Sequence, residues 1–157
     1  MAPRLLVPEL LAAVARRTEL LLDLKGRDRR LSQLLLLQLA PRLEAGAGVT
    51  LCARSWSLLD PFEGVPGVRR LHSVGSARQL ERLRRRLAGG RVEGISIHER
   101  LLDSHTVREV REVADLVLTW PVNTVERARE LLAHGVDGLI SDRPGLVQPV
   151  ALESEEA

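Results

Sequence analysis

Asp23 and Lys25 have the residue types and the spacing that a phosphate or metal site uses. They lie two positions apart near the end of a short apolar segment, 20–26, and on a strand this spacing points both side chains to one face of the sheet. Parallel α/β folds build their sites at the carboxyl ends of strands. A carboxylate there suits a hard divalent cation, and an ammonium group beside it suits a phosphate oxygen. An inward ion pair at the end of the sheet is the alternative interpretation.

Lys25 is the only lysine of the chain, and every other basic residue except the histidines is an arginine. The composition therefore uses arginine wherever a generic positive charge is enough. A single lysine in this setting indicates a position that needs a compact, rotatable ammonium group. This observation favours a functional role for Asp23 and Lys25 over a purely structural ion pair.

Two residues near the later apolar segments are further candidates. Trp120 ends a strand candidate, where it can form one wall of a substrate pocket or cap the layer of core residues. Asp142 follows the last strand candidate and can face a site, although capping of the next turn explains it more simply. Both interpretations stay open for each residue.

The four histidines do not form an evident catalytic set. His72 and His98 come directly after strand candidates, and two histidines at strand ends can act as general acid and base. Exposed loop histidines are the simpler expectation for both. His105 and His134 are typical of helix ends. The sequence contains no metal-spaced Cys/His cluster, no nucleophile elbow and no glycine-rich phosphate loop.

Charge does not indicate a nucleic-acid partner. The formal net charge is only +2, although the pI is about 9.4. The basic run 82–86 lies in a helix candidate whose leucines Leu80, Leu83 and Leu87 mark a buried stripe. Its arginines are therefore expected to cover the solvated face rather than to contact phosphates, and we predict no nucleic-acid binding.

Compartment and membrane signals are also limited. Cys52 is the only cysteine of the 157 residues, so an internal disulfide is impossible and a reducing, cytoplasmic location is the default expectation. No apolar run reaches the ~18 residues that a membrane span needs, so we predict no transmembrane segment. The acidic tail 148–157 is expected to be disordered.

Short apolar runs alternate with amphipathic stretches along 1–147. The strand candidates are 19–25, 49–53, 68–71, 94–97, 114–118 and 138–140; the helix candidates are 8–16, 31–43, the segment with Leu80, Leu83 and Leu87, 104–113 and 124–133. We expect Asn123 or Thr124 to cap the last helix at its start and Gly135 to end it. Six βα repeats predict a parallel sheet, either an open doubly wound sheet or an incomplete (β/α)8 barrel, because a complete barrel typically needs about 250 residues.

Several segments together resemble the glycerophosphodiester phosphodiesterase family. Trp120-Pro121-Val122-Asn123 and the run 135–144, GVDGLISDRP, are similar to the family's closing motif, "WTVN … GVDGIITDRP". The segment 22–25, LDLK, is similar to its "IEIK" strand, and 52–57, CARSWS, resembles its "SSF" strand end. The helix start at Pro8 resembles the segment before "IEIK". The resemblance covers roughly Pro8 to Leu146.

This resemblance implies a fold, a reaction and a set of residues. The fold is a TIM (β/α)8 barrel, of which the chain would contain about six parallel βα repeats, strands 3 to 8. The reaction is the metal-dependent hydrolysis of glycerophosphodiesters to an alcohol and glycerol 3-phosphate, with a divalent cation, Ca²⁺ or Mg²⁺, as cofactor. Asp23 takes a metal-ligand position and Lys25 the phosphate-contacting position. Trp120, Ser55 and Asn123 take substrate-pocket positions.

Two departures from the family pattern change the expected activity. The family has Glu where this chain has Asp23, whose side chain is one methylene shorter, and metal sites tolerate ligand displacements of only about 0.2 Å. The family's "HRG" and "E-x-D" motifs and its catalytic histidines have no counterpart in this sequence. We therefore predict no catalytic residue in this chain, and we expect it to be a C-terminal portion of the family barrel, truncated and inactive alone.

A second hypothesis assigns the chain a role without catalysis. A degenerate barrel of six strands leaves its first and last strands unpaired, and unpaired strand edges are templates for association. The chain would then be a binding or assembly module, and self-association would cover the edges.

Overall fold

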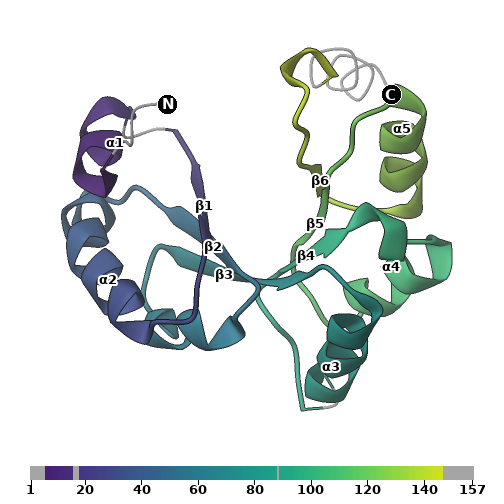
Figure 1. Ribbon diagram of the computed structural model, residues 1–157, viewed down its shortest axis with the longest axis horizontal. Coiled ribbons are helices and arrows are strands. Elements are labelled where there is room, and N and C mark those ends of the chain that lie inside the picture. The colour runs from purple at the N-terminus through teal and green to yellow at the C-terminus, as the bar shows by residue number, and fades with distance from the viewer. Residues whose placement is uncertain (1–5, 16–17, 88, 147–157) are drawn as a thin grey trace. The chain divides into compact units, whose positions relative to one another are not determined.

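The computed structural model describes residues 6–15, 18–87 and 89–146. Within these residues, six parallel strands alternate with helices and are neighbours in the order β1-β2-β3-β4-β5-β6 (Figure 1). Strands that follow one another in the sheet as in the sequence are typical of a (β/α)8 barrel, whereas a doubly wound sheet has a reversal in its strand order. The predicted incomplete barrel is confirmed, and the doubly wound alternative is wrong.

The elements of the described residues have the following bounds. The strands are β1 Leu20–Leu24, β2 Val49–Ala53, β3 Val68–Val74, β4 Ile95–His98, β5 Val117–Trp120 and β6 Gly138–Leu139. The α-helices are α1 Val7–Ala13, α2 Arg29–Glu44, α3 Ala77–Leu87, α4 Ser104–Arg111 and α5 Val125–His134. Short 3₁₀ turns are η1 Trp56–Leu58, η2 Asp60–Phe62, η3 Glu99–Leu101 and η4 Pro144–Leu146.

The chain divides into two compact units. The first unit extends to Leu71 and the second begins at His72, so β3 starts in one and ends in the other. The predicted domain 1–147 thus consists of two units. The predicted tail 148–157 lies outside the described residues.

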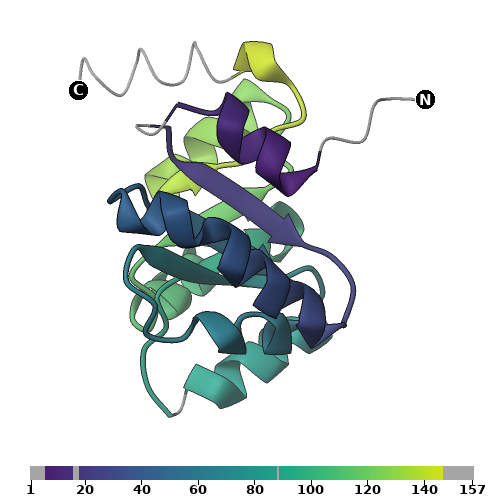
Figure 2. The ribbon, with the colours of Figure 1, turned by 90° about the vertical axis from the view of Figure 1, so that its left-hand side faces the viewer.

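The first unit has its core between α2 and one face of β1 and β2. Leu35 and Leu39 of α2 pack in one cluster with Leu51 and Ala53 of β2, and α2 lies alongside the strands in Figure 2. The alternate β1 residues 20, 22 and 24 join the same cluster. Because side chains on a strand alternate between faces, Leu21 and Asp23 belong to the opposite face of β1.

Local capping explains where the helices of the second unit begin and end. The Asp103 Oδ1 atom accepts a hydrogen bond from the Thr106 backbone N–H at 2.7 Å and starts α4. The backbone hydrogen bond from Thr106, more than its side-chain hydrogen bond, lowers the pKa of Asp103. Thr124 caps α5 through its Oγ1 atom, so of the two predicted residues Thr124 is the cap. Gly135 ends α5 with φ +100°, as predicted.

Two predicted strands differ from the structure by more than one residue at an end. The strand predicted over 114–118 is β5, Val117–Trp120. Ala114 instead forms an isolated bridge with Val92, and Asp115 pairs with Arg91 in solvent. The strand predicted over 68–71 continues to Val74. Pairing with β4 extends it, because residues 72–74 lie opposite 95–97.

His72 is consequently not a loop residue. It lies inside β3 and is buried, so the prediction of an exposed loop histidine is wrong. His98 is the last residue of β4 and is half-buried. His105 and His134 lie in the first turn of α4 and at the end of α5, which confirms the helix-end prediction.

None of the helices in the part of the chain that the structure describes combines the length and the apolar character needed to cross a lipid bilayer.

Candidate functional site

Asp23 and Lys25 meet at the carboxyl end of β1. The Lys25 ammonium donates a hydrogen bond to Asp23 Oδ2 and forms an ion pair with it. The Asp23 side chain is 44% exposed and the Lys25 side chain is 72% exposed. An exposed ion pair is worth at most about 1 kcal/mol, so little free energy opposes its exchange for another partner. The structure therefore contains the ion pair of the alternative interpretation, but exposed rather than inward, and leaves the ammonium group accessible to an anion.

The two residues border a hollow of about 390 Å³ in the first unit. Leu31, Leu34 and Leu35 of α2 form much of its wall, and Val7 of α1 closes it on another side. The hollow thus has one charged end and an otherwise mainly apolar lining. It can accommodate a small molecule that carries both an anionic and an apolar group.

Ser55 follows β2, the neighbour of β1 in the sheet. Leu24 lies opposite Ala53 in the parallel register, so the segments that leave these strands begin at the same edge. Ser55 is half-buried, precedes η1, and its Oγ atom lies 3.4 Å from Ser57 Oγ. The structure places this predicted pocket residue at the carboxyl end of its strand, as β1 places Asp23.

In the second unit, Trp120 packs against His98. The two rings meet edge to face, with their centroids 4.8 Å apart and an interplanar angle of 63°. Gly75, just after β3, lies on another side, where a Cβ atom would be 3.4 Å from Trp120 Cη2. Trp120 is half-buried rather than fully enclosed. It therefore has a packing role and an exposed part, so neither predicted role is excluded.

His98 has a defined orientation that its sequence position did not reveal. Its Nδ1 atom accepts a hydrogen bond from the Arg100 backbone N–H at 3.2 Å, so the neutral ring carries its proton on Nε2. Placement at the end of β4, beside Trp120, adds His98 to the candidate residues. The sequence signal was a histidine after an apolar run, which loop histidines share.

Arg127 holds the segment that follows His98. Its guanidinium donates to Glu99 Oε2 at 2.8 Å, to the Glu99 carbonyl at 2.6 Å and to the Leu102 carbonyl at 3.0 Å. It also pairs with Glu130 at 2.8 Å, and this hydrogen bond lowers the pKa of Glu130. Sequence analysis missed this role because Arg127 and Glu99 lie 28 positions apart, and nothing local distinguishes this arginine from the others.

Asn123 forms hydrogen bonds with the segment after β6. Its Oδ1 atom accepts hydrogen bonds from Ser141 Oγ at 3.0 Å and from the Asp142 backbone N–H at 3.1 Å. The turn at Arg143 is capped by Ser141, whose Oγ accepts from the Arg143 N–H at 3.0 Å. The structure thus gives the capping role predicted for Asp142 to Ser141. A pocket role for Asn123 stays a prediction.

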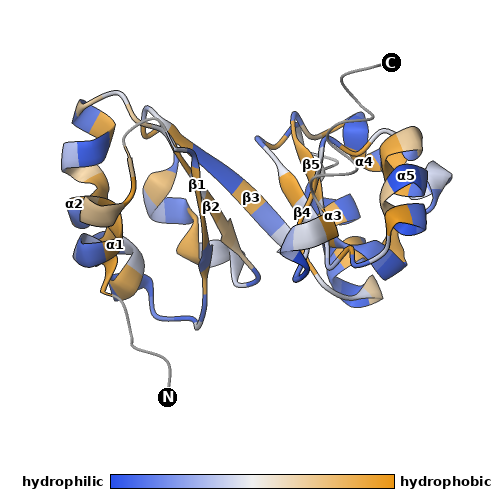
Figure 3. Cartoon of the chain, turned by 90° about the horizontal axis from the view of Figure 1, so that it is seen from above, coloured by the Kyte–Doolittle hydropathy of each residue, from blue (hydrophilic) through white to orange (hydrophobic). Residues whose placement is uncertain are grey.

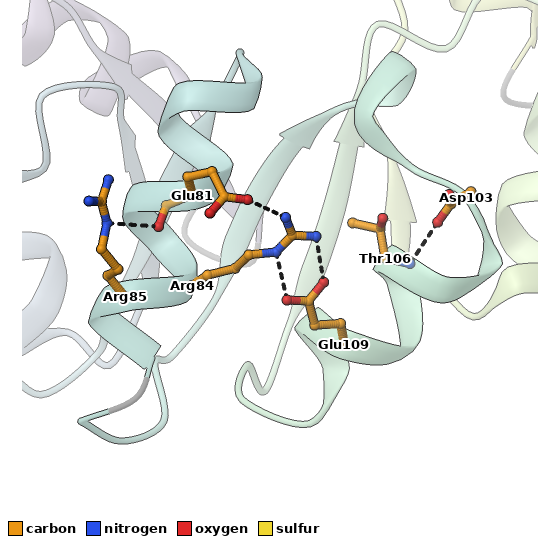
Figure 4. A network of polar contacts seen from close by, with 6 residues as sticks. All are labelled: Glu81, Arg84, Arg85, Asp103, Thr106 and Glu109. Atoms are coloured by element: carbon orange, nitrogen blue, oxygen red, sulfur yellow. Dashed lines mark hydrogen bonds and ion pairs between the residues drawn. The ribbon is translucent and has the colours of Figure 1, made fainter.

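The arginine-rich helix α3 is fixed by acidic partners (Figure 4). Arg84 donates two hydrogen bonds to Glu109 of α4, at 2.7 and 2.8 Å, and pairs with Glu81. The bidentate hydrogen bond to Arg84 lowers the pKa of Glu109, and the Glu109 and Glu81 hydrogen bonds raise that of Arg84. This arginine therefore joins two helices.

The described residues do not by themselves fit a divalent cation. No three His, Cys, Asp or Glu side chains come together among them. Asp23, the predicted ligand, already uses one carboxylate oxygen for Lys25. A hard cation prefers six or more oxygen ligands, so further carboxylates or carbonyls would have to join Asp23.

Comparisons of the sequence alone find no relative. No protein-family model matches it. No curated protein matches it either.

Comparison of the structure finds the same fold in phosphodiesterases. The chain superposes on a glycerophosphodiester phosphodiesterase from Thermotoga maritima with a TM-score of 0.71 at 17% identity, over 96% of this chain and 63% of that one. A phosphodiesterase from Oleispira antarctica, solved with its product sn-glycerol-3-phosphate, gives 0.66 at 20% identity, over 82% and 53%. A protein assigned as a glycerophosphoryl diester phosphodiesterase from Silicibacter pomeroyi gives 0.69 at 20% identity, over 86% and 50%.

These similarities confirm the predicted resemblance at the level of the fold. The chain spans about half to two-thirds of the length of these three proteins.

Proposed function

We propose that this chain is part of a glycerophosphodiester phosphodiesterase. Such an enzyme hydrolyses its substrate to an alcohol and glycerol 3-phosphate. The observation that carries the proposal is the pair Asp23 and Lys25 at the carboxyl end of β1, in a fold shared with proteins of that name. The Oleispira antarctica protein holds sn-glycerol-3-phosphate, the product expected here.

Lys25 is the proposed phosphate contact. Its ammonium group is accessible and its present partner, Asp23, is exposed as well. A doubly charged phosphate can attract the ammonium more strongly than one carboxylate does, because hydrogen bonds to charged groups strengthen with charge. Binding would then move Lys25 from Asp23 to the phosphate and free the Asp23 carboxylate.

Trp120 and Asn123 of the second unit are proposed pocket residues, and Ser55 has the same proposed role in the first unit. The half-buried Trp120 ring offers an apolar surface for the carbon chain of a polyol. His98 is added to them by its contact with that ring, and its Nε2–H group is a hydrogen-bond donor. Each residue is assigned by its place at a strand end.

The 157 residues assayed alone are expected to show no turnover. They contain neither an H-R-G nor an E-x-D motif, to which the resemblance assigns the catalytic histidines and metal carboxylates. Asp23 stays the proposed position of one ligand to Ca²⁺ or Mg²⁺. With one carboxylate, binding of either ion is expected to be no tighter than about millimolar.

Binding of glycerol 3-phosphate tests the proposal directly. Titration followed by NMR should show weak binding, with the largest shifts near Lys25. Lys25→Gln should weaken it roughly tenfold or more, because a charge-assisted hydrogen bond is worth about 1.5–3 kcal/mol. Arg27→Gln is the matched control, since Arg27 is an exposed basic residue two positions away. Equal losses in both variants, or no loss in Lys25→Gln, would contradict the assignment of Lys25.

Turnover is a separate measurement. Release of glycerol 3-phosphate from a glycerophosphodiester is followed with added Mg²⁺ or Ca²⁺. Robust turnover that Asp23→Ala or Lys25→Ala abolishes would overturn the expected inactivity of the chain alone while supporting the two site residues.

A non-catalytic assembly module is the second candidate function. Within the described sheet, β1 and β6 each have one neighbouring strand, and Leu21 of β1 is exposed. Sedimentation analysis of the oligomeric state of the chain tests this candidate, because a stable monomer at high concentration counts against self-association. A cytoplasmic location is proposed for either function.

A further inference from the structure

Helix α2 presents apolar side chains to solvent. Leu31, Leu34 and Leu37 are 55%, 56% and 72% exposed, although α2 already buries Leu35 and Leu39 in the core of the first unit. A surface helix normally has charged and polar residues on its outer face. The three leucines recur at every third position and therefore form a stripe along the helix.

Basic side chains without a partner flank this stripe. Arg27 and Arg30 are exposed, and the described residues provide neither of them with a side-chain ion pair or hydrogen bond. Arg30 lies four positions before Leu34 and thus on the same face of the helix. Asp60 pairs with Arg29 at 3.3 Å, and Asp28 caps α2 by accepting a hydrogen bond from the Arg30 backbone N–H. Asp28 keeps its negative charge in that bond, so the three arginines at 27, 29 and 30 exceed the two aspartates, Asp28 and Asp60, by one positive charge next to the leucines.

We propose that this leucine–arginine face of α2 docks on lipid bilayers that contain anionic lipids. We define the face as Arg30, Leu31, Leu34 and Leu37 of α2 together with Arg27, which precedes the helix. Its leucines would enter the boundary between headgroups and acyl chains, and its arginines would contact anionic headgroups. Helix α2 has leucines on both its buried and its exposed face, and the exposed ones with the nearby arginines supply the two contributions to reversible membrane binding, buried apolar area and electrostatic attraction. The inference goes beyond the proposed phosphodiesterase function, and Leu31 and Leu34 of this face also line the hollow that Asp23 and Lys25 border.

A bilayer fits the face better than a protein partner does. Stable protein interfaces bury roughly 800 Å² on each partner, and three leucine side chains provide much less. Their energetic centres are also enriched in Trp and Tyr, whereas α2 contains no aromatic residue. A few aliphatic side chains with adjacent arginines are enough for peripheral membrane binding, because each basic residue near an anionic surface contributes favourably.

Helix α3 is an internal control for basic charge alone. It carries exposed Arg85 and Arg86, but its leucines Leu80 and Leu83 are buried. Among its described side chains, it therefore combines positive charge with no exposed apolar stripe. In Figure 3, which colours residues by hydropathy, α2 and α3 can be compared directly.

The test is co-sedimentation of the full chain with vesicles. Phosphatidylcholine vesicles are compared with vesicles that also contain about 30% phosphatidylglycerol, which carries the negative charge. We expect binding to the anionic vesicles only, weakened between about 0.1 and 0.5 M NaCl by screening. Arg27→Gln/Arg30→Gln should reduce binding roughly 25-fold, about fivefold for each arginine. Leu34→Ser/Leu37→Ser should abolish it at the same lipid concentration.

Arg85→Gln/Arg86→Gln removes the same charge from α3 and should leave binding unchanged. Circular dichroism checks that each variant keeps the wild-type fold, which is expected because all replaced side chains are exposed. No binding of the wild-type chain to anionic vesicles would overturn the proposal, and so would equal losses in the α2 and α3 arginine variants. A dimer that Leu34→Ser/Leu37→Ser dissociates would assign the face to a second copy instead.

Discussion

The two units of this chain differ in the contacts that join their elements and in the side chains that they leave exposed. In the second unit, ion pairs between residues distant in sequence join neighbouring elements: Arg84 with Glu109, Arg111 with Asp137 at 2.6 Å, and Arg127 with Glu99. The first unit depends on apolar packing of α2 against β1 and β2 and leaves leucines of α2 exposed. The second unit thus joins its elements through ion pairs between distant residues, whereas the first leaves apolar side chains of α2 exposed.

The largest expected effect separates the two cores. Leu39→Ala in the first unit and Leu131→Ala in the second each truncate a fully buried leucine and should cost about 2–5 kcal/mol of stability. Native-state hydrogen exchange of backbone amides measures where the loss occurs. Leu39→Ala should accelerate exchange mainly in β1 and β2, and Leu131→Ala mainly in α5. Identical acceleration of exchange across both units would show that the two units unfold together as one cooperative unit.

A smaller effect is expected at the end of α5 in the second unit. Gly135 has φ +100°, so Gly135→Ala places a Cβ atom in a backbone conformation that costs about 1–2 kcal/mol for L-residues. Thermal unfolding measures the loss. Gly145→Ala is the control, because Gly145 has no heavy atom within 4 Å of its would-be Cβ and no positive φ. Similar losses in both variants would contradict the backbone explanation.

The ion pair between α3 and α4 should make the second unit sensitive to acid. Arg84 holds the pKa of Glu109 below its ordinary value of 4.5. The stabilisation is therefore present above the unfolded-state pKa and is lost as pH falls through the lower folded-state pKa. Glu109→Gln should lower the free energy of unfolding at pH 7 by less than about 1 kcal/mol, because the pair is partly exposed, and thermal unfolding measures the loss. The difference between wild type and variant should begin to shrink below the ordinary pKa and vanish below the lowered folded-state pKa, and a constant difference down to acid pH would contradict this.

The smallest effect is expected on the outer face of α2. Leu37→Gln removes an exposed side chain and should change stability by no more than about 0.5 kcal/mol. Urea unfolding compares the free energy of unfolding of this variant with that of Leu39→Ala, whose residue lies two positions away on the same helix. A large loss in Leu37→Gln would show that this leucine is covered within the folded chain, and the exposed-surface contrast between the units would fail.

Local patterns were sufficient for most of the fold. The run Val49–Ala53 is apolar and β-rich and forms β2 with the predicted bounds. Helix α5 has its cap residue and its terminal glycine in the sequence itself. The predicted strand bounds were wrong where pairing with a neighbouring strand determined how far a strand continues. His72 is polar and comes after an apolar run, but β4 supplies partners that keep it in a strand.

The candidate site was predicted only in part for a similar reason. Asp23 and Lys25 are two positions apart, so strand periodicity alone brings them together. His98 and Trp120 meet through strand register, since His98 lies opposite Trp120 in β4 and β5. Arg127 reaches Glu99 across the loop after β4. No pattern within a few residues encodes such contacts.

The sequence by itself determined the alternation of strands and helices, their caps and the presence of one lysine beside one carboxylate, because all of these depend on residues within a few positions of one another. Only the tertiary structure decided which arginines became ion-pair partners, which histidine met Trp120 and which leucines of α2 stayed exposed. Those outcomes depend on which elements pack together, and each element's neighbours lie about 20 to 30 residues away in the sequence.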